Sequence, residues 1–170
     1  MKVGMTREEK NWVLYDVGNS AFVLLVSTIM PIYFNYLAEN AGISSVNYLA
    51  YWGYATSAAT IIVALLGPVF GTLADTKGLK KTIFTATMLI GGIGCLALGF
   101  ARQWLIFILI YIIAKTGFSG SLIFYDSMLG DVTTEDRVDN VSSQGYAWGY
   151  IGSCVPFIVC LSVVLGAAWI

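Results

Sequence analysis

The sequence contains no histidine and few charged residues, and both absences limit what the protein can do. Without histidine, a Ser-His nucleophile pair, a histidine proton relay and most catalytic zinc sites are excluded. Charged residues make up 11% of the 170 residues, whereas soluble domains contain roughly 25%. The net charge of -1 conceals a strong segregation of charge and says nothing about acidic or basic partners. Nothing else in the sequence supports nucleic-acid binding, so we expect no nucleic-acid partner.

Cysteine is also scarce. Cys95, Cys154 and Cys160 lie in apolar segments and lack a CxxC spacing. We interpret all three as small buried hydrophobic residues rather than as disulfide partners or metal ligands. We therefore expect no metal and no cofactor.

Apolar residues dominate what remains. Hydrophobic residues make up 58% of the chain, and the mean hydropathy is +0.77. A soluble fold of this size could not hide so much apolar surface from water. The composition predicts an all-α, multi-pass transmembrane helical bundle whose solvent is the lipid bilayer.

Five apolar segments are each near or above the roughly 20 residues that a helix needs to cross a bilayer. They cover residues 12–37, 51–73, 82–100, 104–129 and 145–170. The first is not a cleavable signal peptide, because it contains Asp16 and Asn19 and is followed by further apolar segments. We interpret residues 1–170 as a partial N-terminal transmembrane domain.

The basic residues of the loops are distributed unevenly. If the N-terminus is cytoplasmic, only Arg102 lies in an outside loop. The basic residues on the cytoplasmic side are then Lys2, Arg7, Lys10, Lys77, Lys80, Lys81 and Arg137. Because short loops rich in Lys and Arg stay in the cytoplasm, this pattern predicts a cytoplasmic N-terminus.

A polar stripe follows the first segment. Polar side chains inside a membrane span are costly, so they mark candidate functional positions. At helical spacing, one arc of about 100° contains four of them. They are Asp16, Asn19, Ser20 and Ser27. We interpret this stripe as candidate lining of a substrate or coupling cavity.

A second stripe on the fourth segment contains Lys115, Ser119 and Asp126. Lys115 lies near mid-span and needs a carboxylate partner, a water-filled cavity or an anionic ligand. About 16 Å of helix separates it from Asp126, which excludes pairing within the helix. A substrate or coupling role, an interhelical ion pair such as one with Asp16, and a shallower position than the span suggests all stay open.

Asp16 and Asp126 lie near the cytoplasmic ends of their segments. Each carboxylate has a gating or proton-linked interpretation, and each also fits plain hydrogen bonding and packing at a helix end. Because histidine is absent, carboxylates are the candidate carriers if a proton is the coupling ion.

Small residues and prolines give a weaker signal. Glycines gather on one helix face at Gly67xxxGly71, at Gly91-Gly92-x-Gly94 and at Gly145xxxGly149xxGly152. Such faces let helix backbones approach closely in lipid. Pro31, Pro68 and Pro156 each remove a backbone donor and are predicted to kink or end their helices.

The loop between the second and third segments, residues 71–81, reads GTLADTKGLKK. Its spacing resembles the loop motif of the major facilitator superfamily, although Thr76 and Leu79 stand where that motif often has basic residues. The resemblance implies that a few loop residues shape a tight hairpin and latch the two transporter halves. These residues are Gly71, Asp75, Gly78, Lys80 and Lys81.

Other segments narrow the resemblance. Residues 12–22 (WVLYDVGNSAF), 124–131 (FYDSMLGD) and 141–152 (VSSQGYAWGYIG) resemble the first, fourth and fifth helices of the vacuolar amino-acid effluxer-like branch and its bacterial relatives. Asp126 and Gly130 depart from the Asn and Pro of that pattern. The resemblance implies twelve helices in two six-helix halves, with this chain supplying five helices of the N-terminal half. It also implies that the first and fourth helices line the central cavity.

We therefore predict a fragment of a secondary active membrane transporter and not an enzyme. The resemblance implies a small-molecule substrate, with amino acids leading, moved by alternating access with a proton as a candidate coupling ion. Its expected partners are the bilayer, the substrate and the missing C-terminal half of the transporter. We expect the bacterial inner membrane rather than a vacuolar membrane.

Two alternatives stay open. The chain stops at Trp169-Ile170 inside an apolar run, which we interpret as truncation. A natural stop there would instead favour a non-transporting half-length protein or partner subunit, and the length of the intact reading frame separates the two. The remote alternative is an intramembrane aspartyl protease using Asp16 and Asp131, which lacks the first glycine of a GxGD pattern.

Overall fold

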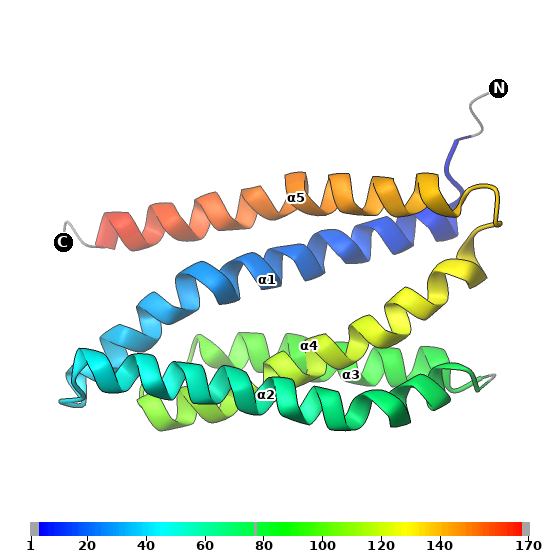
Figure 1. The fold of residues 1–170 in the computed structure, drawn as a ribbon. Coiled ribbons are helices and arrows are strands. Elements are labelled where there is room, and N and C mark those ends of the chain that lie inside the picture. The colour runs from blue at the N-terminus through cyan, green and yellow to red at the C-terminus, as the bar shows by residue number, and fades with distance from the viewer. Residues whose placement is uncertain (1–3, 77, 168–170) are drawn as a thin grey trace. The chain divides into compact units, whose positions relative to one another are not determined.

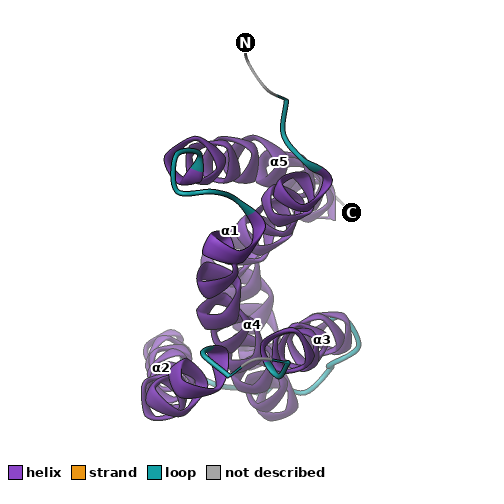
Figure 2. Ribbon diagram, turned by 90° about the vertical axis from the view of Figure 1, so that its right-hand side faces the viewer, coloured by secondary structure: helices purple, strands orange, loops and turns teal. Residues whose placement is uncertain are grey.

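The structure, a computed structural model, describes residues 4–76 and 78–167. Within these residues every regular element is an α-helix, and Figure 2 shows the helices joined by loops and turns. The helices are α1 (Arg7–Asn40), α2 (Ser45–Ala74), α3 (Lys80–Leu98), α4 (Trp104–Val132) and α5 (Val138–Ala167) (Figure 1). All five are long and apolar enough to cross a membrane. The predicted all-α membrane fold is confirmed.

Most helices extend beyond the apolar segments from which they were predicted. α1 begins at Arg7 and α5 at Val138, each ahead of its segment, because backbone hydrogen bonding continues where the sequence turns polar. Pro31, Pro68 and Pro156 lie inside their helices, so none of them ends its helix, and the alternative that each kinks its helix stays a prediction. Lys2, Lys77 and residues 168–170 lie outside the described residues.

The described contacts divide the chain into two units, and each is considered by itself. Unit 1 is Met1–Pro31 with Met128–Ile170, and unit 2 is Ile32–Ser127. Unit 1 therefore contains the first part of α1, the end of α4 and the whole of α5 as described. Unit 2 takes its contacts from the rest of α1, from α2 and α3, and from most of α4.

Aromatic rings hold part of unit 2 together. Phe34 stacks on Trp52 with ring centroids 5.7 Å apart and on Phe107 at 6.0 Å. Trp52 also meets Tyr111 at 4.4 Å, and Phe34 and Tyr111 are both fully buried. The Tyr111 hydroxyl lies 3.2 Å from the Thr56 hydroxyl, which satisfies its polar end. This cluster ties the end of α1 to α2 and α4.

Glycines bring α3 and α4 into close contact in unit 2. A Cβ added to Gly91 would lie 2.6 Å from the Phe118 ring, and one added to Gly94 would lie 2.8 Å from Ala114 Cβ. The predicted packing role is thus confirmed for these two glycines, whereas a Cβ on Gly92 would meet no described atom within 4 Å.

The same role is not seen for the pair on α2. A Cβ on Gly67 or Gly71 would have no atom within 4 Å among the described residues. The prediction that these two glycines lie at a close helix contact is wrong among the described residues. The spacing places both glycines on one helix face, but it does not determine whether another helix packs against that face.

Replacing Gly117 with alanine is expected to destabilise the protein by about 2 kcal/mol, the typical cost of overpacking. The new Cβ would lie 2.6 Å from the backbone nitrogen of Gly91 and 2.9 Å from the carbonyl oxygen of Thr87, and backbone atoms cannot swing aside. The measurement is the thermal unfolding midpoint in detergent. Gly130→Ala is the matched control on the same helix, because its Cβ would meet no atom of the described residues within 4 Å. Equal midpoints for the two variants would contradict the prediction.

Candidate functional site

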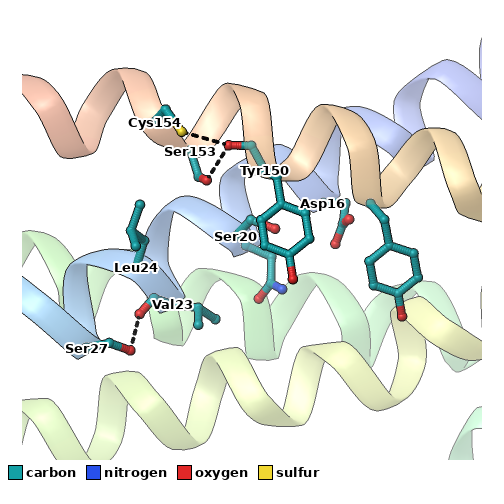
Figure 3. Close-up of a pocket in the computed structure, with 10 residues that line it drawn as sticks. Asp16, Ser20, Val23, Leu24, Ser27, Tyr150, Ser153 and Cys154 are labelled. Carbon is teal, nitrogen blue, oxygen red and sulfur yellow. Dashed lines mark hydrogen bonds between the residues drawn. The ribbon is translucent and has the colours of Figure 1, made fainter.

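A pocket of about 400 Å³ lies between α1 and α5, entirely within unit 1. Such a volume falls in the range that small-molecule sites occupy, roughly 300 to 1,000 Å³. Six lining residues come from α1 and four from α5 (Figure 3). They are Asp16, Asn19, Ser20, Val23, Leu24, Ser27, Tyr146, Tyr150, Ser153 and Cys154.

Helical periodicity places these side chains. The α1 members recur three or four positions apart, which keeps them on one face of the helix. On α5, Tyr146, Tyr150 and Ser153 follow the same spacing. The structure thus brings together all four residues of the predicted first stripe, and α5 supplies the facing wall.

Glycines let α5 approach α1 closely beside the pocket. A Cβ on Gly145 would lie 2.7 Å from the Trp12 ring, and a Cβ on Gly152 would collide with Val17. A Cβ on Gly149 would lie 2.8 Å from Ser20 Oγ and 2.9 Å from Asp16 Oδ2. The predicted packing role of this glycine face is confirmed, and at Gly149 the missing side chain leaves room for pocket oxygens.

Acceptor oxygens dominate the polar part of the pocket. Asn19 is 9% exposed, and its Oδ1 has no hydrogen-bond partner among the described residues. The Ser27 hydroxyl donates to the Val23 carbonyl at 2.8 Å, and the Ser153 hydroxyl donates to the Tyr150 carbonyl at 2.9 Å. Because both serine hydrogens are used on the backbone, the hydroxyl oxygens keep their lone pairs for a guest.

Cys154 corrects one expectation. Its side chain is exposed and lines the pocket, so the prediction that it is a buried hydrophobic residue is wrong. Its thiol donates to the Tyr150 carbonyl, one helical turn earlier on α5, at 3.2 Å. Cys95 and Cys160 are partly exposed, so burial is incomplete for them as well.

The second predicted stripe belongs to unit 2 and takes no part in this pocket. Lys115 is partly buried, and its Nζ lies 5.9 Å from the centroid of the Tyr111 ring, a cation–π contact one helical turn away. It makes no ion pair in residues 4–76 and 78–167. Ser119 is partly buried and Asp126 is exposed. Their assignment to a substrate cavity stays a prediction.

The loop motif of unit 2 forms the expected tight connection. Asp75 ends α2, and its backbone N–H points to the carbonyls of Gly71 and Leu73. Gly78 has a φ of 89°, a conformation that favours glycine. The Lys80 ammonium donates to the Ser127 carbonyl at 3.3 Å, whereas Lys81 is exposed. The latch that the resemblance implies for these charges stays a prediction.

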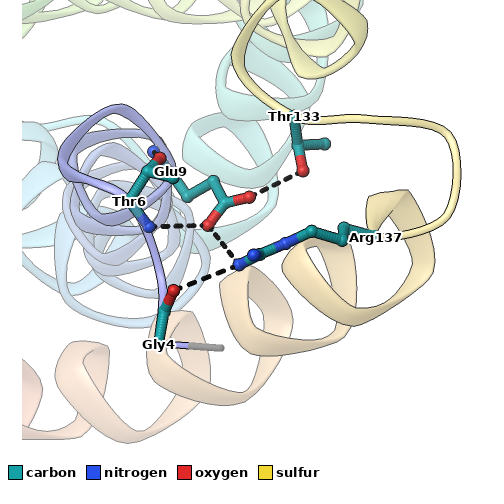
Figure 4. Close-up of polar contacts among 5 residues, drawn as sticks. All are labelled: Gly4, Thr6, Glu9, Thr133 and Arg137. Carbon is teal, nitrogen blue, oxygen red and sulfur yellow. Dashed lines mark hydrogen bonds and ion pairs between the residues drawn. The ribbon is translucent and has the colours of Figure 1, made fainter. Parts of the chain in front are cut away.

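The sequence interpretation missed a polar cluster at the start of α1. The Glu9 carboxylate is 1% exposed and accepts from the Thr6 backbone N–H at 2.8 Å and from the Thr133 hydroxyl at 2.7 Å. It also pairs with the Arg137 guanidinium at 2.8 Å, which donates to the Gly4 carbonyl as well (Figure 4). All five residues belong to unit 1.

One signal for this cluster was present in the sequence. Thr6 and Glu9 have the T-x-x-E spacing of a capping box, and the Glu9 N–H does bond to the Thr6 hydroxyl at 3.2 Å. The partners Thr133 and Arg137 carry no such signal. The α5 wall of the pocket was also missed, although Tyr146, Tyr150 and Ser153 share a helical spacing that could have revealed it.

Among the residues described, no group of three or more His, Cys, Asp or Glu side chains could hold a metal ion.

The helices and the pocket define an integral, multi-pass membrane protein with a polar site between two candidate membrane spans. The chain belongs to the family described as vacuole effluxer Atg22 like, whose model matches residues 5–138. It is 41% identical over 163 residues to YxiO of Bacillus subtilis (strain 168), described as an uncharacterized MFS-type transporter. That match covers 94% of this chain and 38% of the relative, so the chain spans about two fifths of the relative's length. No solved structure matches the chain. The family recognised from the sequence is confirmed.

Proposed function

We propose that this chain is the N-terminal transmembrane portion of a secondary transporter that moves amino acids or similar small solutes by alternating access. The observation that carries the proposal is the polar pocket of unit 1, which the α1 stripe lines between two candidate membrane spans. A polar cavity at membrane depth is costly to maintain in lipid unless a solute or ion uses it. Membership of a family described as vacuole effluxer-like supports the same conclusion.

We also propose the orientation of the chain, its membrane and its coupling ion. The N-terminus lies in the cytoplasm, as the basic loops favour, and the protein resides in a bacterial inner membrane, as its Bacillus relative supports. A C-terminal half completes the transport path, and a proton is the candidate coupling ion. Transport rather than catalysis is the activity.

Flux through reconstituted vesicles tests the proposal. The protein expressed from its intact reading frame is placed in liposomes loaded with a mixture of amino acids, and release is followed by mass spectrometry with and without a proton gradient. Release above that of protein-free liposomes supports the proposal. No release of any amino acid under either condition contradicts it.

Lys115→Ala is expected to lower the flux of a zwitterionic or anionic solute about tenfold while leaving protein abundance unchanged. The cause is the loss of the one positive charge deep in its span, roughly the worth of a charge-assisted hydrogen bond. Lys115→Arg keeps the charge and is expected to retain most of the flux. Unchanged flux in Lys115→Ala would remove this residue from the transport path.

A further inference from the structure

We infer that the α1–α5 pocket binds a small positively charged group, with Asp16 as its counter-charge. This inference rests on the proposed function and names the chemistry that the pocket recognises. The group is either the ammonium end of a transported solute or a free inorganic monovalent cation, since both seek anionic and neutral oxygens in the same way.

The charge of the lining supports a cation. Asp16 is the only charged residue among those that line the pocket, and no lysine or arginine lines it. Its carboxylate has no hydrogen-bond or ion-pair partner in the described part of the chain. A carboxylate within a candidate membrane span that has no partner is costly, and a bound cation removes most of that cost.

Asn19 gives a second, independent observation. Its side chain is more than nine-tenths buried, it lines the pocket, and its Oδ1 has no partner among the described residues. Buried amide oxygens are nearly always hydrogen-bonded in folded proteins, so an unsatisfied one on a pocket-lining residue marks a place for a donor. An ammonium group supplies up to three such donors.

Gly149 sets the geometry. The point where its Cβ would stand is 2.8 Å from Ser20 Oγ and 2.9 Å from Asp16 Oδ2, so both oxygens converge on the bare α5 backbone. Because Ser20 Oγ and Asp16 Oδ2 both lie within 3 Å of one point, a single compact cation can contact both oxygens. Ser27 and Ser153 add acceptor lone pairs, because their hydrogens are committed to backbone carbonyls.

The remaining walls are apolar. Val23 and Leu24 line the pocket on α1, and the tyrosine rings of Tyr146 and Tyr150 line it on α5. A pocket of this volume therefore accepts an alkyl chain as well as the charged end. Butylammonium, which joins a short alkyl chain to a primary ammonium, is a suitable probe.

Binding of three probes to the protein from its intact reading frame, in lipid nanodiscs, tests the inference. The probes are butylammonium chloride, its uncharged analogue 1-butanol, and sodium chloride, and dissociation constants come from thermal-shift titrations. Asp16→Asn is expected to weaken butylammonium binding about tenfold, the loss expected for one charge-assisted hydrogen bond, and to leave 1-butanol unaffected. Asp139→Asn is the matched control, because Asp139 is exposed on α5 and does not line the pocket.

The sodium arm distinguishes the two sources. Sodium binding that depends on Asp16, with no such dependence for butylammonium, identifies an inorganic cation as the guest. Asp16→Glu keeps the charge and is expected to restore most of the binding, which separates loss of charge from loss of fold. Equal affinities of wild type and Asp16→Asn for both cations would overturn the inference, even if vesicle flux supports transport. Asp16-dependent cation binding without any amino-acid flux would uphold the inference and contradict the proposed function.

Discussion

Gly149→Ala is expected to reduce amino-acid flux about tenfold to hundredfold. The added methyl group would stand 2.8 Å from Ser20 Oγ and 2.9 Å from Asp16 Oδ2, where a bound solute needs both oxygens. Overpacking of this kind costs about 1 to 3 kcal/mol, and each 1.4 kcal/mol is about tenfold in an equilibrium constant. Flux from loaded liposomes is the measurement, made on the protein from its intact reading frame.

Gly166→Ala provides the matched control for this substitution. Gly166 lies on the same helix, and a Cβ there would meet no described atom within 4 Å. The flux through the Gly166→Ala protein should equal that through the wild type. Thermal unfolding of both variants shows whether a lost flux reflects a blocked pocket or separated helices. Normal flux through a folded Gly149→Ala protein would show that the α1–α5 pocket lies off the transport path.

Glu9→Gln is expected to lower the free energy of unfolding by about 2 to 3 kcal/mol. The substitution removes the charge of a fully buried carboxylate that receives bonds from Thr6, Thr133 and Arg137. Breaking a buried ion pair costs about 3 to 5 kcal/mol, and the Arg137 side chain, at 24% exposed, recovers part of that through water. The measurement is unfolding in detergent micelles, followed by circular dichroism.

Glu8→Gln is the control, since Glu8 lies in the same helical turn but is exposed. That change should be nearly neutral. A double-mutant cycle with Arg137→Met isolates the ion pair from the capping box, and we expect a coupling free energy of about 2 kcal/mol. Additive effects would mean that the capping box alone accounts for the stability at this end of α1.

Much of the fold followed from local patterns. The five described helices, the turn at Gly78 and the polar face of α1 are each set by residues close in sequence, through hydropathy, turn chemistry and the 3.6-residue period. Asp16, Asn19, Ser20 and Ser27 share a face for this reason, and the pocket contains all four.

The predictions that failed depended on neighbours. Gly67 and Gly71 have the same spacing as Gly145 and Gly149, yet only the latter pair meets another helix among the described residues. Cys154 sits in an apolar run but lines the pocket. A spacing defines a helix face, and burial depends on what packs against that face.

The sequence by itself determined that the protein lies in a lipid bilayer, where its helices run and to which family it belongs. Low charge, long apolar runs and short motifs are local properties of the chain, so they can be read without the tertiary structure. Only the tertiary structure decided that the α1 stripe faces Tyr150 and Gly149 of α5, and that Glu9 pairs with Arg137, 128 positions away. Contacts between distant segments depend on which helix faces fit together, and periodicity within one segment carries no record of its partner.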